Sequence, residues 1–208
     1  MPNFEFEEPL WQSNQIVAGV DEVGRGCLAG PVVSAAVIIN PHYKNLEFIN
    51  ELNDSKKIPK SKREELANLI KEYFEYSINF VDNHIIDKIN ILQSAILSMD
   101  NSIQTLISKP DHLLIDGNRF KKYEINYSLI IKGDMLSNSI AAASIVAKVN
   151  RDDYVVSVMD KEFPEYEFYK HKGYATKRHI ELLHKYGPCK YHRQSFLTKI
   201  FSNQEKIF

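Results

Sequence analysis

The sequence predicts an α/β fold in which helices cover the faces of a sheet. Short apolar, β-branched segments bounded by glycine or proline predict strands, whereas apolar residues repeated every three or four positions predict amphipathic helices. The two kinds of segment are mixed along the chain. The chain has 208 residues, of which 44% are hydrophobic and 25% charged, so it can form one sizeable core or at most two small domains.

Five strands are expected. The first two, at residues 16–23 and 31–39, are apolar and β-branched and are bounded by glycine and proline. A third strand is expected at residues 76–81. Two more are expected at residues 112–116 and 125–131.

Four helices are expected. Residues 61–74 form an amphipathic helix, at whose start Ser61 and Glu64 fit a capping box. Residues 85–103 carry apolar side chains at alternating steps of four and three, which predicts one helix. Residues 137–161 begin alanine-rich and are expected to press closely on the sheet. Residues 176–186 form a shorter helix.

Composition also bears on where the protein works. No apolar run approaches the roughly 20 residues that a membrane helix needs, and the first residues carry the wrong charge for a secretory signal. We therefore expect a cytoplasmic protein that does not bind membranes. Cys27 and Cys189 do not make a disulfide framework or a zinc site, so both are expected to be free thiols.

The charge is unevenly distributed. The formal net charge of −1 argues mildly against a nucleic-acid-binding protein. From Lys170 to Arg193, however, seven lysines and arginines face a single acid, Glu181, and four of the seven histidines lie in the same stretch. Such a basic segment could dock on phosphates. A solvated helix face would explain the same charges, and the charges alone do not decide between the two interpretations.

Four acidic residues lie at the ends of apolar strands. Asp21 and Glu22 follow Ile16–Val20, Asp116 ends the strand at 112–116, and Asp134 comes just after the strand at 125–131. Parallel neighbours would bring these ends to one edge of the sheet, where ligands bind in α/β folds. A cap at a strand end would explain any one of these acids, but explains all four together less well.

Crowded carboxylates cannot all stay ionised without a cation. A divalent ion with oxygen ligands, Mg²⁺ or Mn²⁺, is expected, while the absence of histidine and cysteine from the set argues against zinc. Adjacent residues of a strand face opposite sides. Asp21 and Glu22 are therefore expected to reach one site only if regular strand pairing ends between them.

Seven motifs in order resemble bacterial ribonuclease HII, over roughly residues 15–197. The motifs are Gly19–Pro31, Asn53–Lys57, Ile115–Gly117, Lys132–Asp134, Ala141–Val149, His171–Thr176 and His192–Phe196. The resemblance implies an RNase H-like fold: a mixed five-stranded sheet flanked by helices, with a helical C-terminal extension. It also implies one catalytic domain over residues 1–208, with a core at about 15–165 and a basic helical part at about 166–208.

The resemblance also implies site residues. The family's acidic quartet, which binds the metal and is catalytic, maps onto Asp21, Glu22, Asp116 and Asp134. Its Gly-Arg-Gly loop, which contacts the ribose 2′-hydroxyl, maps onto Gly24, Arg25 and Gly26. Its tyrosine that packs on the following deoxyribose maps onto Tyr174, for which a core aromatic is the alternative. The remaining expected substrate contacts, to phosphates, are Ser55, Lys56, Lys172 and Arg193. Ser144, Lys148 and Arg151 lie in the long helix, where packing or a salt bridge explains them as well as a role in the site does.

The function implied is an endonuclease that hydrolyses the RNA strand of RNA–DNA hybrids and cuts 5′ of single ribonucleotides in duplex DNA. Two Mn²⁺ or Mg²⁺ ions in the substrate complex would leave 3′-hydroxyl and 5′-phosphate ends. An integrase or junction resolvase of the same fold is one alternative, and a non-catalytic hybrid-binding module is another. The expected protein is a monomer, and Ser202–Phe208 contains no clear sliding-clamp motif.

Overall fold

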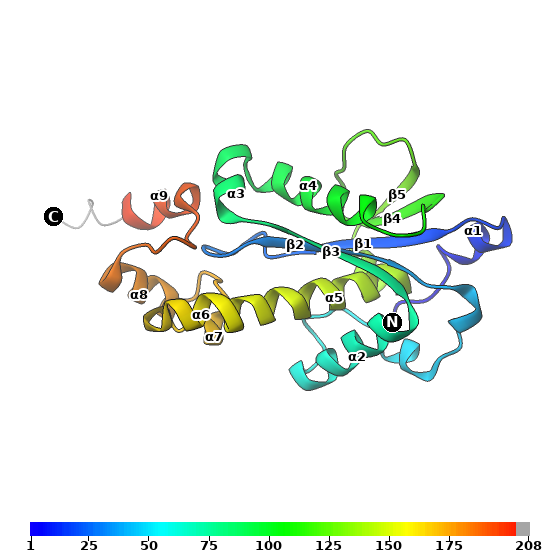
Figure 1. The fold of residues 1–208 in the computed structure, drawn as a ribbon, viewed down its shortest axis with the longest axis horizontal. Helices are drawn as coiled ribbons and strands as arrows, with labels where there is room; N and C mark the ends of the chain where they lie inside the picture. The colour runs from blue at the N-terminus through cyan, green and yellow to red at the C-terminus, as the bar shows by residue number, and fades with distance from the viewer. Residues whose placement is uncertain (203–208) are drawn as a thin grey trace.

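A mixed five-stranded sheet organises the computed structural model, which describes residues 1–202 (Figure 1). The sheet order is β3-β2-β1-β4-β5. The strands are β1 (Val17–Val23), β2 (Val32–Ile38), β3 (Glu75–Val81), β4 (His112–Asp116) and β5 (Asn126–Ile130). β1 pairs with β2, and β2 with β3, in antiparallel fashion, whereas β1–β4 and β4–β5 are parallel. The expected mixed sheet is confirmed.

Helices cover both faces of this sheet (Figure 1). One face carries α3 (Asn83–Ile89) and α4 (Ile91–Gln104), and the other carries α5 (Asn138–Tyr154) with α2 (Lys60–Tyr73) beyond it. Side chains alternate between the two layers, as the pleat of a strand requires. Val33, Ala35 and Val37 of β2 pack toward α5 and α2, whereas Ala36 packs toward α4.

The close approach of α5 to β1 explains its alanine-rich start. Ala141, Ala142 and Ala143 are fully buried. A Cβ added to Gly19 of β1 would overlap the backbone of Ser139, so only glycine leaves room for the helix there. The expectation of a helix pressed on the sheet is confirmed, and the contact fixes α5 beside the strand that carries Asp21.

The structure corrects two helix predictions. The helix expected at 85–103 is two helices, broken at Asn90, which has φ 67° and whose Oδ1 accepts from the amides of Leu92 and Gln93. The apolar stripe runs across the break, so its spacing could not reveal it. The capping box is also wrong. Because α2 begins at Lys60 after Pro59, Ser61 lies inside the first turn and no side chain caps this helix.

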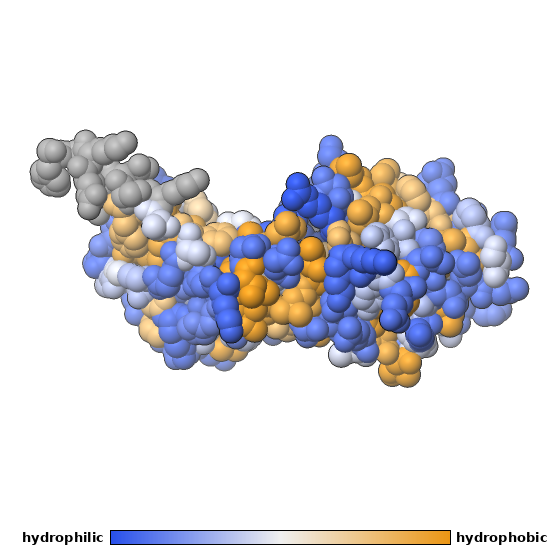
Figure 2. Space-filling model, turned by 90° about the horizontal axis from the view of Figure 1, so that it is seen from above, coloured by the Kyte–Doolittle hydropathy of each residue, from blue (hydrophilic) through white to orange (hydrophobic). Residues whose placement is uncertain are grey.

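The C-terminal part is helical, as expected. After α5 a π-helical turn (Val155–Met159) leads to α6 (Asp160–Glu162), α7 (Phe168–His171) and α8 (Lys177–Tyr186). This part ends in α9 (Gln194–Ser202), whereas α1 (Glu8–Gln12) near the start of the chain was not predicted. Short 3-10 turns occupy 41–43, 47–51, 133–135 and 164–166. The outline narrows between these C-terminal helices and the sheet with its helices (Figure 2).

The C-terminal segment is joined to the loop after β1. The amide of Leu28 donates to the carbonyl of Gly173 at 2.8 Å, and the amide of Gly30 to that of Tyr191 at 2.9 Å. The fold thereby brings residues 24–30 against residues that follow about 150 positions later. Within residues 1–202, no helix is long and apolar enough to cross a membrane. The expectation about a sliding-clamp motif lies largely outside these residues.

Candidate active site

The four predicted carboxylates lie at one edge of the sheet. Asp21 and Glu22 belong to β1, Asp116 is the last residue of β4, and Asp134 lies in the 3-10 turn after β5. Because β1, β4 and β5 run parallel, their ends meet there. All four residues line one hollow of about 380 Å³. The other residues that line it are Val23, Gly24, Arg25, Gly26, Ser55, Lys56, Ser144 and Tyr174.

Asp21 and Glu22 reach this hollow for a different reason from the one expected. Regular pairing does not end between them, because β1 pairs with β2 as far as Val23. Pairing with β4, however, stops at Val20. Asp21 therefore lies on the α5 side, and Glu22 also lines a second hollow on the α4 side together with Met99. Because β1 extends beyond the end of its pairing with β4, the side chains of Asp21 and Glu22 both reach the hollow at the unpaired edge of β1.

Burial and mutual repulsion act on the carboxylates. Burial raises the pKa of Asp21 well above its ordinary value, and the charges of Glu22 and Asp116 add to the rise. Burial also raises the pKa of Glu22, of Asp116 and of Asp134. Full ionisation of the group is thus opposed by its surroundings, and a divalent cation held by these oxygens would relieve that opposition.

Protein donors hold three of the carboxylates. Asp21 Oδ1 accepts from the amide of Glu22 at 2.7 Å, and Asp116 Oδ1 accepts from the amide of Gly133 at 2.6 Å. Glu22 Oε1 pairs with Arg25 Nη1 at 3.0 Å. In the described part of the chain, no three acidic, histidine or cysteine side chains form a ready-made metal site. The donor chemistry fits a hard cation, and the side chains would have to turn toward one to bind it.

The Gly24–Gly26 loop borders the carboxylates. Gly24 has φ 95°, and a Cβ on it would overlap the side chain of Arg151. Gly26 is exposed and meets open space. Glycine is therefore required by backbone conformation at Gly24, whereas at Gly26 it leaves the backbone open to a ligand.

Tyr174 lines the same hollow as the carboxylates. Its backbone bridges that of Cys27, and its half-buried ring lies 5.4 Å from Lys148 Nζ and 5.7 Å from Arg151 Cζ. Burial raises the pKa of its hydroxyl to about 12. The ring is thus neutral and partly open to the hollow rather than sealed in the core.

The structure places Ser55 and Lys56 in the hollow, but not Lys172 and Arg193. Lys56 is exposed, and Ser55 Oγ lies 3.1 Å from Ser144 Oγ. Lys172 lines a separate hollow with Asp152. Arg193 is fully buried, and its guanidinium donates to backbone carbonyls and lies 5.2 Å from the centroid of the Phe196 ring. A direct phosphate contact by Arg193 is therefore wrong for this structure, because no guanidinium nitrogen reaches solvent.

The long helix α5 supplies residues whose roles the sequence left open. Ser144 lines the hollow and its hydrogen bond to Asp21 opposes the rise of that pKa. Lys148 pairs with Asp152 at 2.8 Å. Arg151 donates to the carbonyls of residues 29, 31 and 172. Of these three residues only Ser144 lines the hollow, whereas Lys148 and Arg151 lie beside the ring of Tyr174.

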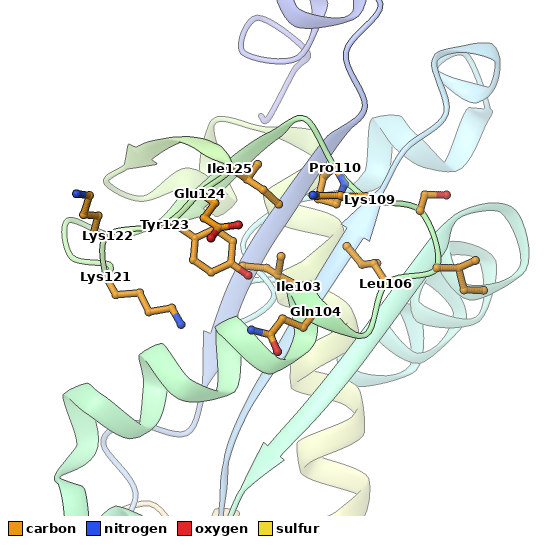
Figure 3. Close-up of a pocket in the computed structure, with 12 residues that line it drawn as sticks. Ile103, Gln104, Leu106, Lys109, Pro110, Lys121, Lys122, Tyr123, Glu124 and Ile125 are labelled. Carbon is orange, nitrogen blue, oxygen red and sulfur yellow. The ribbon is translucent and has the colours of Figure 1, made fainter.

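Size alone does not locate the site. A larger hollow, of about 610 Å³, lies between the segments that precede β4 and β5 (Figure 3). Its wall combines Ile103, Leu106 and Ile125 with Tyr123 and the rim residue Lys109. None of the predicted site residues lines it. The chemistry is concentrated in the smaller hollow, where the carboxylates converge.

Solved structures place this fold among the ribonucleases H. Ribonuclease H2 from Pyrococcus horikoshii superposes with a TM-score of 0.72 and 26% identity, over 91% of this chain and 99% of that chain. Bst-RNase HIII in complex with Mn²⁺ gives a TM-score of 0.57 at 17% identity, over 92% of this chain and 71% of that one, a likeness that shows the fold alone. The class is therefore an RNase H-fold ribonuclease.

Sequence comparisons narrow the class further. The family model described as Ribonuclease HII matches residues 18–199. Ribonuclease HII of Caldicellulosiruptor bescii is 49% identical over 201 residues, covering 96% of this chain and 95% of that protein. The enzyme of Chlorobaculum parvum is 47% identical over 198 residues, covering 94% and 96%. The chain belongs to the ribonuclease HII family and is a ribonuclease H enzyme.

Proposed function

We propose that this ribonuclease H hydrolyses the RNA strand of RNA–DNA hybrids and also cuts 5′ of single ribonucleotides embedded in duplex DNA, leaving 3′-hydroxyl and 5′-phosphate ends. One observation carries the proposal. The four carboxylates share a single hollow with the Gly24–Gly26 loop and Tyr174. The hollow thus combines the groups for hydrolysis with groups that can read a sugar.

The carboxylates of Asp21, Glu22, Asp116 and Asp134 would hold Mn²⁺ or Mg²⁺, with two ions in the substrate complex. Bound ions of this kind activate a water and stabilise the leaving oxygen of a phosphodiester. The Mn²⁺ complex of the structural neighbour Bst-RNase HIII supports this choice of metal. Ser144 hydrogen-bonds Asp21, and the amide of Gly133 donates to Asp116, so both carboxylates are held within the hollow and would turn from there toward a bound ion.

The loop would recognise ribose. Arg25 and Gly26 are exposed residues, and the missing side chain of Gly26 lets a sugar come close to the backbone. A 2′-hydroxyl is what distinguishes RNA from DNA at this distance. Tyr174 would pack on the following deoxyribose. The exposed Lys56 and the more deeply placed Ser55 would contact phosphates in the same hollow.

The deciding experiment uses an end-labelled DNA duplex with one ribonucleotide, beside an all-DNA duplex of the same sequence. We expect one cut on the 5′ side of the ribonucleotide and none in the control duplex. A ligation reaction with the products identifies the 3′-hydroxyl and 5′-phosphate ends. Cutting of the all-DNA duplex would favour a junction resolvase, and binding without cutting would favour the non-catalytic module.

A further inference from the structure

Arg193 supports the loop that follows β1, residues 24–30, through hydrogen bonds to its backbone. Its side chain is fully buried. Its guanidinium donates to the carbonyl of Gly24 at 2.8 Å, to that of Arg25 at 3.0 Å and, through two nitrogens, to that of Gly30 at 2.9 and 2.8 Å. One side chain therefore fixes the beginning and the end of the loop.

A second buried arginine extends this support. Arg151 of α5 is also fully buried and donates to the carbonyls of Pro31 at 2.9 Å and Ala29 at 3.2 Å. Its Nη1 also donates to the carbonyl of Lys172, two residues before Tyr174, at 3.0 Å. Within residues 1–202, neither Arg151 nor Arg193 forms a salt bridge. Backbone carbonyls thus compensate two buried charges, an expensive arrangement for a purely structural contact.

The direction of these carbonyls sets the direction of the next amides. In a planar trans peptide the C=O of one residue and the N–H of the next point opposite ways. With the carbonyls of Gly24 and Arg25 turned inward to Arg193, the amides of Arg25 and Gly26 point outward. Neither amide finds an acceptor within residues 1–202, and both residues are exposed.

Histidines tie Tyr174 to the same support. His179 donates from Nδ1 to the carbonyl of Tyr174 at 2.9 Å, and its Nε2 lies 3.0 Å from His192 Nε2. His192 Nδ1 accepts from the amide of Cys189 at 2.9 Å, so its own proton is on Nε2. His192 precedes Arg193 directly and bridges Ala29. The donor and acceptor roles of His179 and His192 are thereby fixed, and both rings are neutral.

We propose that Arg193 is a positioning residue for ribose recognition, which turns the amides of Arg25 and Gly26 toward the substrate, and that the His192–His179 pair sets Tyr174 in register with them. The inference rests on the proposed function of the loop and of Tyr174. The Gly24–Gly26 loop and Tyr174 are then held at a fixed spacing. Together they recognise a ribonucleotide followed by a deoxyribonucleotide. Arg193 acts through the loop and does not touch the substrate.

The test measures kcat and KM on the duplex with one ribonucleotide. Arg193→Lys keeps the charge but not the planar fork of donors. We expect kcat to fall about 100-fold, a loss that a misplacement of about 1 Å can cause, with KM little changed. The kcat of Arg193→Ala should fall by a similar factor and should rise again when free guanidinium is added. Ile70→Ala, a core change in α2 far from the hollow, controls for reduced stability and should gain nothing from guanidinium.

A second pair of variants covers the case in which the Arg193 variants do not fold. His192→Gln keeps a donor toward His179 and should retain most cleavage at the single ribonucleotide. His192→Leu removes it and should lower kcat at that site. Wild-type kcat in folded Arg193→Lys, or equal kcat in the two His192 variants, would overturn the inference. Failure of the wild-type protein to cut the ribonucleotide duplex would instead overturn the proposed function.

Discussion

Glu22 shows how one side chain links the two faces of the sheet. It points to the α4 side of β1, yet it lines the hollow shared with Asp21 because β4 stops short. Its side chain is only 8% exposed and pairs with Arg25. Glu22 therefore forms an ion pair with Arg25 in this structure. A cation bound by Glu22 would have to replace Arg25 in that pair.

Asp116→Asn tests the carboxylate set at single-residue resolution. The change removes one charge from the hollow and leaves the side-chain size unchanged, so kcat on a hybrid duplex should fall by orders of magnitude. Binding of the hybrid should be retained, since repulsion toward phosphate is reduced. Asp82→Asn, which replaces one exposed helix cap with another, is the matched control. Near-normal kcat in Asp116→Asn would contradict the assignment.

Tyr174→Ala tests the sugar contact. The flat ring offers apolar contact to a deoxyribose, whereas a 2′-hydroxyl there would be crowded or left without a partner. Cleavage at a single ribonucleotide should therefore fall more than cleavage within a long RNA–DNA hybrid. Both substrates are compared in one assay for wild type and variant. Equal reductions on the two would mean that Tyr174 serves packing alone.

At the scale of elements, α8 divides its residues between the interior and the surface. His179, Leu182 and Leu183 are buried, while Lys177 and Lys185 are exposed. Three of the four histidines in the basic segment, His171, His179 and His192, are buried as well. Three of the four histidines thus serve the interior, whereas His184, Lys177 and Lys185 face the solvent.

The exposed lysines of α8 give a prediction about salt. If they contact phosphates, replacing Lys177 and Lys185 by glutamine should weaken binding to all duplexes alike. The slope of log affinity against log salt should flatten by about one unit for each phosphate that the variant no longer neutralises. Lys109→Gln, on the rim of the distant hollow, should leave the slope unchanged. An unchanged slope in the α8 variant would identify these lysines as an ordinary solvated face.

The buried histidines give a prediction about pH. Burial lowers the pKa of His179 to about 3 and that of His192 to about 4, below the ordinary 6.5 of the unfolded chain. Between pH 6.5 and about 4 the unfolded chain therefore binds protons that the folded chain does not, so these residues reduce stability as pH falls. Buried carboxylates with raised pKa act in the opposite direction, so the wild type alone does not isolate the effect.

The comparison with His192→Gln isolates it. Removing one such histidine should make the free energy of unfolding less sensitive to acid, by at most about 1.4 kcal/mol per pH unit. Urea unfolding at several pH values between about 7 and 5 measures the difference. Parallel curves for wild type and variant would show that His192 takes up its proton in the folded state too.

At the scale of the whole molecule, the site exists because three parallel strands end at one edge and the C-terminal helices close over the loop beyond it. The sheet supplies the carboxylates, and a segment about 150 residues later supplies Tyr174 and the support of the loop. The four acids and the Gly24–Gly26 loop thus meet Tyr174, which follows about 150 residues after that loop, only in the folded protein.

Metal binding should therefore be visible in the stability of the whole molecule. A ligand that binds only the folded chain raises its melting temperature, so Mg²⁺ or Mn²⁺ should raise that of the wild type and raise that of Asp21→Asn less. Excess chelator should abolish cleavage, and zinc should not restore it, because the ligands are all oxygens. Full cleavage in chelator would contradict a metal-dependent reaction.

The sequence predicted the strands and the convergence of the four acids, because strand ends and apolar periods are local patterns that parallel pairing brings to one edge. The sequence predicted the mixed sheet only through its resemblance to ribonuclease HII. It also carried the motifs that identify the family. It did not determine the break at Asn90, which leaves the apolar period intact, nor the start of α2 before Ser61.

Contacts between distant segments determine which polar residues face the hollow. Arg193 and Lys56 both carry a positive charge, and composition cannot separate them. Arg193 is buried against carbonyls of the loop after β1, whereas Lys56 lies open at the rim. Burial depends on contacts between segments far apart in the chain, so a local motif can name a charged residue but not say whether it meets the substrate or supports the backbone that does.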